Sequence, residues 1–176
     1  MDEHRMKKFL IIGNKNAITQ KGFFPLIKDN KVWFGHNVPK DFSINGEPTT
    51  RINEISRWFT NMENLKHNSP LPLTQKYSPE KYPKYDNYDA INVDKTKDIP
   101  CDYYGVMGVP VSFLDKYSPE QFEILGGFNY RSLNTVDVKK GEIYGTPVKI
   151  ETSKSLFNGP VVNGKAVYFR ILIKRK

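Results

Sequence analysis

The sequence predicts an α/β fold that continues into a β-rich C-terminal region. Three observations support this prediction. An unbroken apolar run lies near the start of the 176 residues, a short amphipathic helix and a second apolar segment follow it, and the last residues alternate between apolar and polar types. The hydrophobic content of 38% is enough for one sizeable core.

The first apolar run is Lys8–Asn14, with the sequence KFLIIGN. A continuous apolar run of this length is typical of a strand that is buried on both faces in the middle of a parallel sheet. Only Met1–Lys7 precede it. We therefore expect the later part of a larger α/β domain whose earlier strands are absent.

A short helix is predicted next, from a capping Thr19 to Ile27, with Pro25 as a kink or as the first residue of a restarted helix. Val32–Phe34 is the following strand, joined by a right-handed crossover. Turn residues then predict a loop or a small hairpin around Asn45-Gly46.

A strand is favoured over a helix at Ile55–Thr60. Residues 63–89 are polar and proline-rich, which predicts a long surface excursion. Within it, Lys81–Asp89 interleaves tyrosines with lysines, as a surface that stacks bases and neutralises phosphates does. The alternative is that Tyr82, Tyr85 and Tyr88 hold this loop to the core.

Strands are predicted at Tyr88–Val93 and over an extended segment, Tyr104–Leu114. Gly105 and Gly108 lack the third glycine and the following helix of a cofactor loop, so they are expected to let the backbone bend or pack closely.

Ser118-Pro-Glu-Gln121 predicts a capped helix that runs to Leu125 and stops at Gly126-Gly127. Near the C-terminus, Asn163-Gly164 predicts a hairpin between Pro160–Val162 and Lys165–Ile173. The basic residues of this end, among them Arg170, Lys174, Arg175 and Lys176, either contact phosphates or discourage edge-to-edge strand pairing.

The formal net charge of +8 makes a polyanion such as nucleic acid a plausible partner. Cys101 is the only cysteine, which excludes an internal disulfide and fits a cytoplasmic protein. His4, His36 and His67 lack metal-ligand spacing, so no metal site is expected. The first apolar run is too short for a signal peptide or a membrane span.

Several blocks in succession resemble the EcoRI-type adenine-specific DNA methyltransferases of restriction-modification systems. They are Phe9-Leu-Ile-Ile-Gly-Asn-Lys-Asn-Ala17, Phe24-Pro-Leu-Ile27, Trp58-Phe-Thr-Asn61, Tyr85-Asp-Asn-Tyr-Asp-Ala-Ile91, Gly105-Val-Met-Gly-Val-Pro110, Phe113-Leu-Asp-Lys-Tyr-Ser-Pro-Glu-Gln-Phe-Glu-Ile-Leu-Gly126 and Arg170-Ile-Leu-Ile-Lys-Arg175. The blocks occur in the family's order and span nearly the whole chain.

The resemblance implies transfer of a methyl group from S-adenosylmethionine to the N6 amine of an extruded adenine in duplex DNA. It also implies a tetrapeptide of the Asn-Pro-Pro-Phe type and a glycine-containing cofactor loop, both placed before the Phe9 strand in the family's order. This sequence contains neither. We therefore assign no catalytic and no cofactor-binding residue, and expect that the chain alone binds no cofactor and does not methylate.

The resemblance makes the Phe9 strand the one after the tetrapeptide strand of a methyltransferase-like Rossmann sheet, with Val32–Phe34 and Ile55–Thr60 as its closing antiparallel part. We expect a partial α/β core over residues 1–62, a surface excursion over 63–89, and a β-rich region over 90–176 packed on the same core.

Duplex DNA is the expected partner. Its candidate contacts are Asn14, Lys15, Asn16, Lys84, Tyr85, Lys174 and Arg175. For the first three, the alternative is that Asn14 caps a turn and the lysine is solvated. A separate chain carrying the cofactor half, or a second copy, would cover the Phe9 strand; no membrane partner is expected. The alternative is a stand-alone module that binds DNA or a protein and has no catalytic role.

Overall fold

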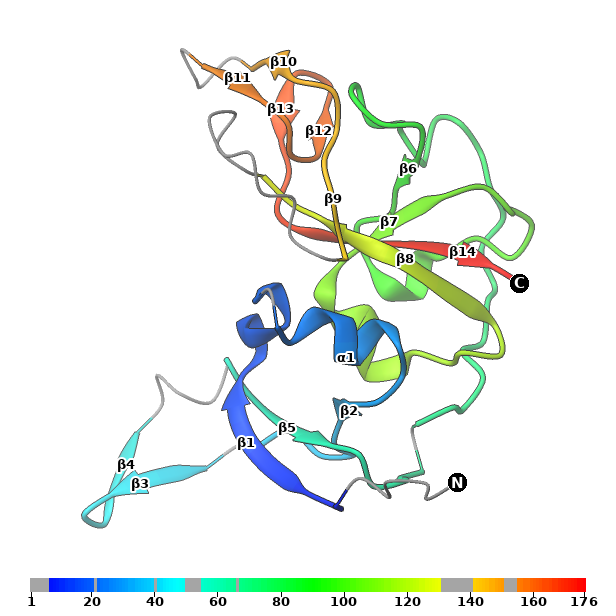
Figure 1. The fold of residues 1–176 in the computed structure, drawn as a ribbon. Coiled ribbons are helices and arrows are strands. Elements are labelled where there is room, and N and C mark those ends of the chain that lie inside the picture. The colour runs from blue at the N-terminus through cyan, green and yellow to red at the C-terminus, as the bar shows by residue number, and fades with distance from the viewer. Residues whose placement is uncertain are drawn as a thin grey trace, which may run out of the picture.

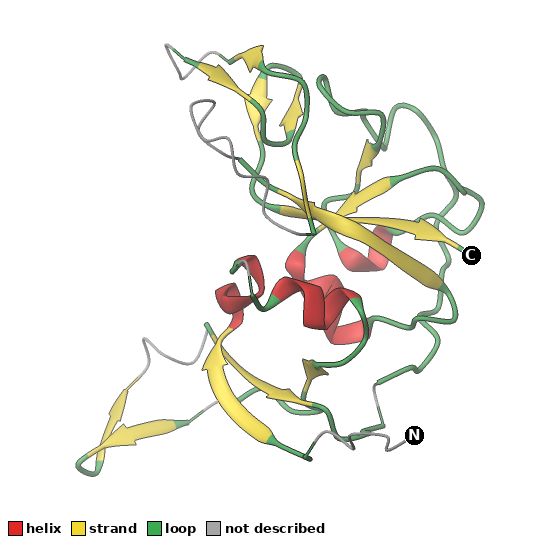
Figure 2. Ribbon diagram, in the orientation of Figure 1, coloured by secondary structure: helices red, strands yellow, loops and turns green. Residues whose placement is uncertain are grey.

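The computed structural model describes residues 7–20, 22–39, 41–49, 55–65, 67–130, 141–150 and 155–176. Strands dominate these residues, and the helices are few and short (Figure 2). The helices are η1 (Lys15–Thr19), α1 (Phe24–Lys28), η2 (Thr96–Asp98) and η3 (Val111–Lys116), where η denotes a 3-10 helix. The strands are β1 (Leu10–Asn14), β2 (Trp33–Phe34), β3 (Phe42–Ile44), β4 (Glu47–Thr49), β5 (Ser56–Thr60), β6 (Ile91–Asn92), β7 (Met107–Val109), β8 (Phe122–Phe128), β9 (Glu142–Ile143), β10 (Val148–Lys149), β11 (Leu156–Phe157), β12 (Val161–Val162), β13 (Lys165–Ala166) and β14 (Arg170–Arg175).

The N-terminal sheet has three strands in the order β1-β5-β2. Strand β5 is antiparallel to both neighbours, with Phe59 opposite Ile11 on one side and Phe34 on the other. Strands β1 and β2 therefore run in the same direction, and β5, which comes after both in the sequence, lies between them (Figure 1). The strand predicted at Ile55–Thr60 is confirmed as Ser56–Thr60, and it pairs antiparallel with the strand predicted at Val32–Phe34.

Strand β1 differs from its sequence prediction. Leu10, Ile11 and Ile12 are 52%, 58% and 40% exposed, although an apolar run of this kind predicts burial on both faces. The reason is that the described residues supply β1 with a strand neighbour on one side only, which is β5. Among the described residues β1 is therefore an edge strand with an exposed apolar surface.

The predicted helix after β1 is divided in two. Asn14 caps η1, because its side-chain oxygen accepts a hydrogen bond from the backbone of Asn16 at 2.9 Å. The α-helix begins at Phe24 with Pro25 in its first turn, where a missing N–H costs nothing. The predicted restart at Pro25 is thus one residue away from the observed start. The capping role predicted for Thr19 is wrong, because Thr19 is the last residue of η1 and the N-cap of α1 is Phe23, which makes no side-chain cap bond.

A short hairpin, β3–β4, lies apart from the other sheets (Figure 1). Its turn is Asn45-Gly46, with φ of 53° and 86°. These positive values suit Asn and Gly and twist the turn to match its strands. The hairpin predicted from this dipeptide is confirmed.

The C-terminal half is built on a five-stranded sheet with the order β6-β7-β14-β8-β9. The last strand in sequence, β14, is its centre, and Ile171, Leu172 and Ile173 are fully buried. Two parallel pairs, β6 with β7 and β8 with β9, make the sheet mixed. Because β14 is a central strand, the explanation of its basic residues as protection of a sheet edge is wrong.

Three other predicted elements are shorter or broken. The long strand Lys165–Ile173 divides into β13 and β14, although its hairpin turn at Asn163-Gly164 is confirmed by φ values of 50° and 73°. The strand Tyr88–Val93 is limited to Ile91–Asn92. The extended segment Tyr104–Leu114 is a strand only at Met107–Val109 and then becomes η3.

The helix predicted after Ser118 is wrong. Only one turn forms, in which the backbone N–H groups of Gln121 and Phe122 donate to the Ser118 carbonyl at 3.2 and 3.0 Å. The chain then enters β8, which pairs with β14 along its length. The Gln121 side chain caps no helix but bonds both backbone groups of Leu71. Pairing with a central buried strand outweighs the local capping signal.

One apolar cluster joins the two halves of the chain. It includes Phe24 and Phe59 from the N-terminal part with Phe113, Phe122 and Ile171 from the C-terminal part. Among the residues the structure describes, no helix is long and apolar enough to cross a membrane, and no group of His, Cys, Asp or Glu is placed to hold a metal.

Candidate nucleic-acid interface

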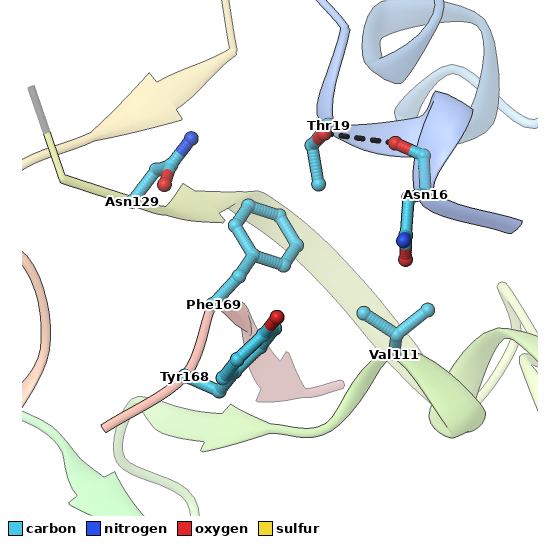
Figure 3. Close-up of a pocket in the computed structure, with 6 residues that line it drawn as sticks. All are labelled: Asn16, Thr19, Val111, Asn129, Tyr168 and Phe169. Atoms are coloured by element: carbon cyan, nitrogen blue, oxygen red, sulfur yellow. Dashed lines mark hydrogen bonds between the residues drawn. The ribbon is translucent and has the colours of Figure 1, made fainter.

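An open pocket of about 370 Å³ lies between the N-terminal and C-terminal parts of the chain (Figure 3). Its lining combines apolar, aromatic and amide side chains: Asn16, Thr19, Val111, Asn129, Tyr168 and Phe169. The first two residues and the last two are about 150 positions apart in sequence. The fold therefore builds the pocket from segments that local sequence patterns do not connect.

The N-terminal wall of the pocket is η1, which directly follows the carboxyl end of β1. The Thr19 hydroxyl donates to the Asn16 carbonyl at 2.8 Å (Figure 3). With the Asn14 side chain bonded to the Asn16 backbone N–H at the other end, this short turn is held at both sides. The turn follows the carboxyl end of β1, and the neighbour of β1 in the sheet, β5, is antiparallel to it.

The opposite wall is formed where β8 ends and β14 begins. The Phe169 ring lies edge-on to Phe24, with ring centroids 6.4 Å apart. Gly127 allows this position, because a Cβ atom there would lie 2.8 Å from the Phe169 ring. Tyr168, the neighbouring residue, is 86% exposed. One aromatic ring is thus anchored while the next faces solvent.

Of the residues predicted to contact DNA, Asn14, Lys15 and Asn16 lie together at the end of β1, and Asn16 lines the pocket. Asn14 caps η1, as the alternative interpretation of this residue expects. Lys15 is half-buried and lines a smaller neighbouring cavity.

Tyr85 is in the core instead, with 5% exposure. Its hydroxyl donates to the Asn92 side-chain oxygen at 2.9 Å, and burial raises its pKa. Tyr82 is buried as well. These tyrosines hold the 63–89 segment to the core, as the alternative interpretation expects, so Tyr85 has no free ring face for DNA in this structure.

Lys84 remains exposed and forms an ion pair with Asp89 at 3.2 Å, which raises the pKa of the lysine. Lys174 and Arg175 end β14, about 20 Å along the strand from Tyr168. The Arg175 guanidinium donates to the Cys101 carbonyl and lies over the Tyr104 ring at 4.8 Å. The structure therefore does not bring these three basic residues to the pocket.

Sequence reasoning missed Tyr168 and Asn129. Tyr168 was placed within one long strand, where it would have alternated with the apolar residues. The available signal was a pair of adjacent aromatic residues, Tyr168-Phe169, which a regular strand would direct to opposite faces. No sequence pattern marks Asn129 as a pocket residue.

The family described as "Adenine-specific methyltransferase EcoRI" matches residues 3–176. No solved structure matches. The match thus covers the three-stranded sheet, the pocket and the C-terminal sheet together.

Three curated proteins are similar to almost the whole chain, each alignment covering 97% of it. The type II methyltransferase M.EcoRI of Escherichia coli is 43% identical and is covered over 51% of its length. M.MgeORF184P of Mycoplasma genitalium is 36% identical and M.MpnI of Mycoplasma pneumoniae 32% identical, each covered over 57% of its length. The chain spans about half the length of these relatives, and it belongs to the EcoRI-type adenine-specific DNA methyltransferase family.

Proposed function

We propose that this chain supplies the later sheet strands and a DNA-binding surface of an adenine N6 methyltransferase, and that it methylates only together with a cofactor-binding part. The exposed apolar edge of β1 carries this proposal. An uncovered strand of Leu10, Ile11 and Ile12 is an interaction surface rather than a normal protein exterior. The antiparallel pairing of β5 with both β1 and β2 also suits the closing antiparallel part expected of a methyltransferase-like sheet.

S-adenosylmethionine donates the methyl group in this family, and its adenosine needs partners for the ribose hydroxyls. Carboxylates commonly fill that role in nucleotide sites. The pocket lining contains no Asp or Glu, and the sequence contains no Asn-Pro-Pro or Asp-Pro-Pro segment. The lining of this pocket therefore does not fit the cofactor, and we derive no catalytic step from it.

The chain alone is expected neither to bind S-adenosylmethionine nor to transfer a methyl group to duplex DNA. Titration calorimetry and a radiolabelled methyl-transfer assay measure these two properties. Micromolar cofactor binding by the isolated chain would contradict the proposal that a separate part of the enzyme binds the cofactor.

Binding to duplex DNA is expected to depend on charge and to weaken with salt, because lysines that contact phosphates release counterions. Lys15→Ala is expected to lower the affinity and to reduce the slope of log K against log salt by about 1. Lys165→Ala, an exposed lysine on β13, is the control. Fluorescence anisotropy over a salt series gives both slopes, and equal slopes for the two variants would remove Lys15 from the interface.

The other candidate, a stand-alone module for DNA or protein binding, predicts a chain that is monomeric and complete without a partner. The exposed β1 surface favours the first candidate, because a complete module would cover such a strand. A second copy of the chain is the other partner that this edge accepts. With duplex DNA as its ligand and a type II methyltransferase among its relatives, the chain is proposed to act in the cytoplasm as part of a restriction-modification system.

A further inference from the structure

The hairpin β3–β4 has an open strand edge, because the described residues give β3 only β4 as a strand neighbour. In a hairpin with a two-residue turn, here Asn45-Gly46, the flanking residues Ile44 and Glu47 bond to each other. The next pair, Ser43 and Pro48, therefore directs its backbone groups outward. Proline has no N–H, so the outer edge of β4 lacks a donor there. The outer edge of β3 keeps both the N–H and the carbonyl of Ser43.

Strand β1 has a matching open edge. The backbone N–H of Lys15 donates to the Ile55 carbonyl at 2.7 Å, which continues the pairing of β1 with β5 by one residue. Backbone groups of successive strand residues point to opposite sides, so those of Ile11 also face β5. Those of Leu10 and Ile12 face the side on which the described residues supply no strand. Unused donors and acceptors of this kind are a template for pairing with another chain.

The two edges also carry apolar side chains that fit one register. Ser43 can exchange both of its outward hydrogen bonds with Ile12 in an antiparallel pair. The next pair in that register is Ile44 with Ile11, which are 60% and 58% exposed. Side chains that lie directly opposite in a sheet contact each other. This register therefore covers two exposed isoleucines at once.

The charges of the hairpin indicate which molecule supplies the second edge. Residues 41–49 contain Asp41 and Glu47 and no Lys, Arg or His, whereas the whole chain has a formal net charge of +8. Phosphates repel an acidic ribbon, so nucleic acid does not suit this hairpin. Strand β1 suits it, because Lys8 precedes this strand and Lys15 follows it. The chain thus carries both halves of a complementary pair, on separate sheets.

We propose that β3 of one copy of this chain adds to the open edge of β1 in a second copy, in the antiparallel register that places Ile44 opposite Ile11. Addition of a strand to an exposed sheet edge is a common mode of recognition. The joined sheet has the order β4-β3-β1-β5-β2, with its first two strands from one copy. The inference rests on the proposed function in one respect: the cofactor-binding part takes the same edge of β1 and displaces the hairpin.

Sedimentation velocity of the full chain at increasing concentration measures the association, which the unmodified chain is expected to show. Ile44→Lys and Ile11→Lys are each expected to weaken it by about tenfold or more, because a lysine directed into a strand pair opposes pairing. Leu156→Lys is the control. Leu156 is a strand leucine with 49% exposure on β11, so its replacement is expected to leave the association unchanged.

A mixture of the two weakened variants tests the pairing directly. Ile44→Lys keeps an intact β1, and Ile11→Lys keeps an intact hairpin. An equimolar mixture is therefore expected to associate although neither variant does so alone, which also shows that both variants are folded. A mixture that stays monomeric would overturn the pairing. Association that is lost with Ile11→Lys and kept with Ile44→Lys would overturn it too, because β1 would then pair with β1 of the other copy.

The outcomes for this pairing and for the proposed function are distinct. Addition of the part of the Escherichia coli relative that this chain does not cover is expected to dissolve the association and to form the enzyme. A chain that is monomeric at every concentration, yet gives active enzyme with that part, would overturn the pairing alone. Association that is restored in the mixture, but persists without activity when the part is added, would support the pairing and overturn the proposed function.

Discussion

Ile11→Lys is expected to abolish methyl transfer in an enzyme reassembled from this chain and the part of the Escherichia coli relative that it does not cover. Ile11 lies on β1 and is 58% exposed in this chain. In the assembled sheet the same side chain would be covered. An unpaired charge buried there costs about 3–5 kcal/mol, which weakens the assembly by a factor of roughly 100 or more. Coexpression of the two parts, followed by a methyl-transfer assay, measures the loss.

The isolated chain is expected to tolerate the same substitution, with its free energy of unfolding changed by no more than about 0.5 kcal/mol. Ile44→Lys is a closely matched control, because Ile44 is also a strand isoleucine and is 60% exposed, but on the separate hairpin β3–β4. Reassembled enzyme should keep its activity with Ile44→Lys. Full activity with Ile11→Lys would show that the cofactor-binding part docks elsewhere.

The sequence predicted best those elements whose geometry depends on few neighbouring residues. Asn45-Gly46 and Asn163-Gly164 each form a turn with positive φ at both positions, because only a few residue types adopt that backbone without strain. The strand at Ser56–Thr60 was also predictable from its β-branched and aromatic residues. The residue types at and next to these positions are enough to determine the two turns and the strand.

Predictions that depended on tertiary partners were less accurate. The capping signal at Ser118 yields a single turn, and the Ser118 hydroxyl donates to the Asn68 carbonyl. Phe122–Phe128 forms a strand because β14 offers a buried partner along its whole length. The apolar run of β1 identified a strand and could not reveal that the strand would be exposed. The pocket was not predictable, because Asn16 and Tyr168 meet only after both sheets have formed.

Gly108→Ala is expected to lower the free energy of unfolding by about 3 kcal/mol. Gly108 is buried in β7, between β6 and β14. A Cβ atom there would lie 2.1 Å from the Tyr85 hydroxyl oxygen and 2.8 Å from two of its ring carbons. Urea denaturation gives the change. Gly22→Ala is the control, because a Cβ atom at that position meets nothing within 4 Å.

The expected loss of stability in Gly108→Ala is attributed to Tyr85 because the tyrosine side chain has no space to move away from a new methyl group. Its ring lies edge-on to Phe128 with centroids 5.2 Å apart, and its hydroxyl is bonded to Asn92. Tyr85→Leu should cost stability by itself, since it removes that bond and part of the ring. In the double variant the smaller side chain leaves space for the new methyl group, so the combined loss should fall below the sum of the two single losses by at least about 1 kcal/mol. Additive losses would mean that the methyl group at position 108 is resisted by the strand backbone rather than by Tyr85.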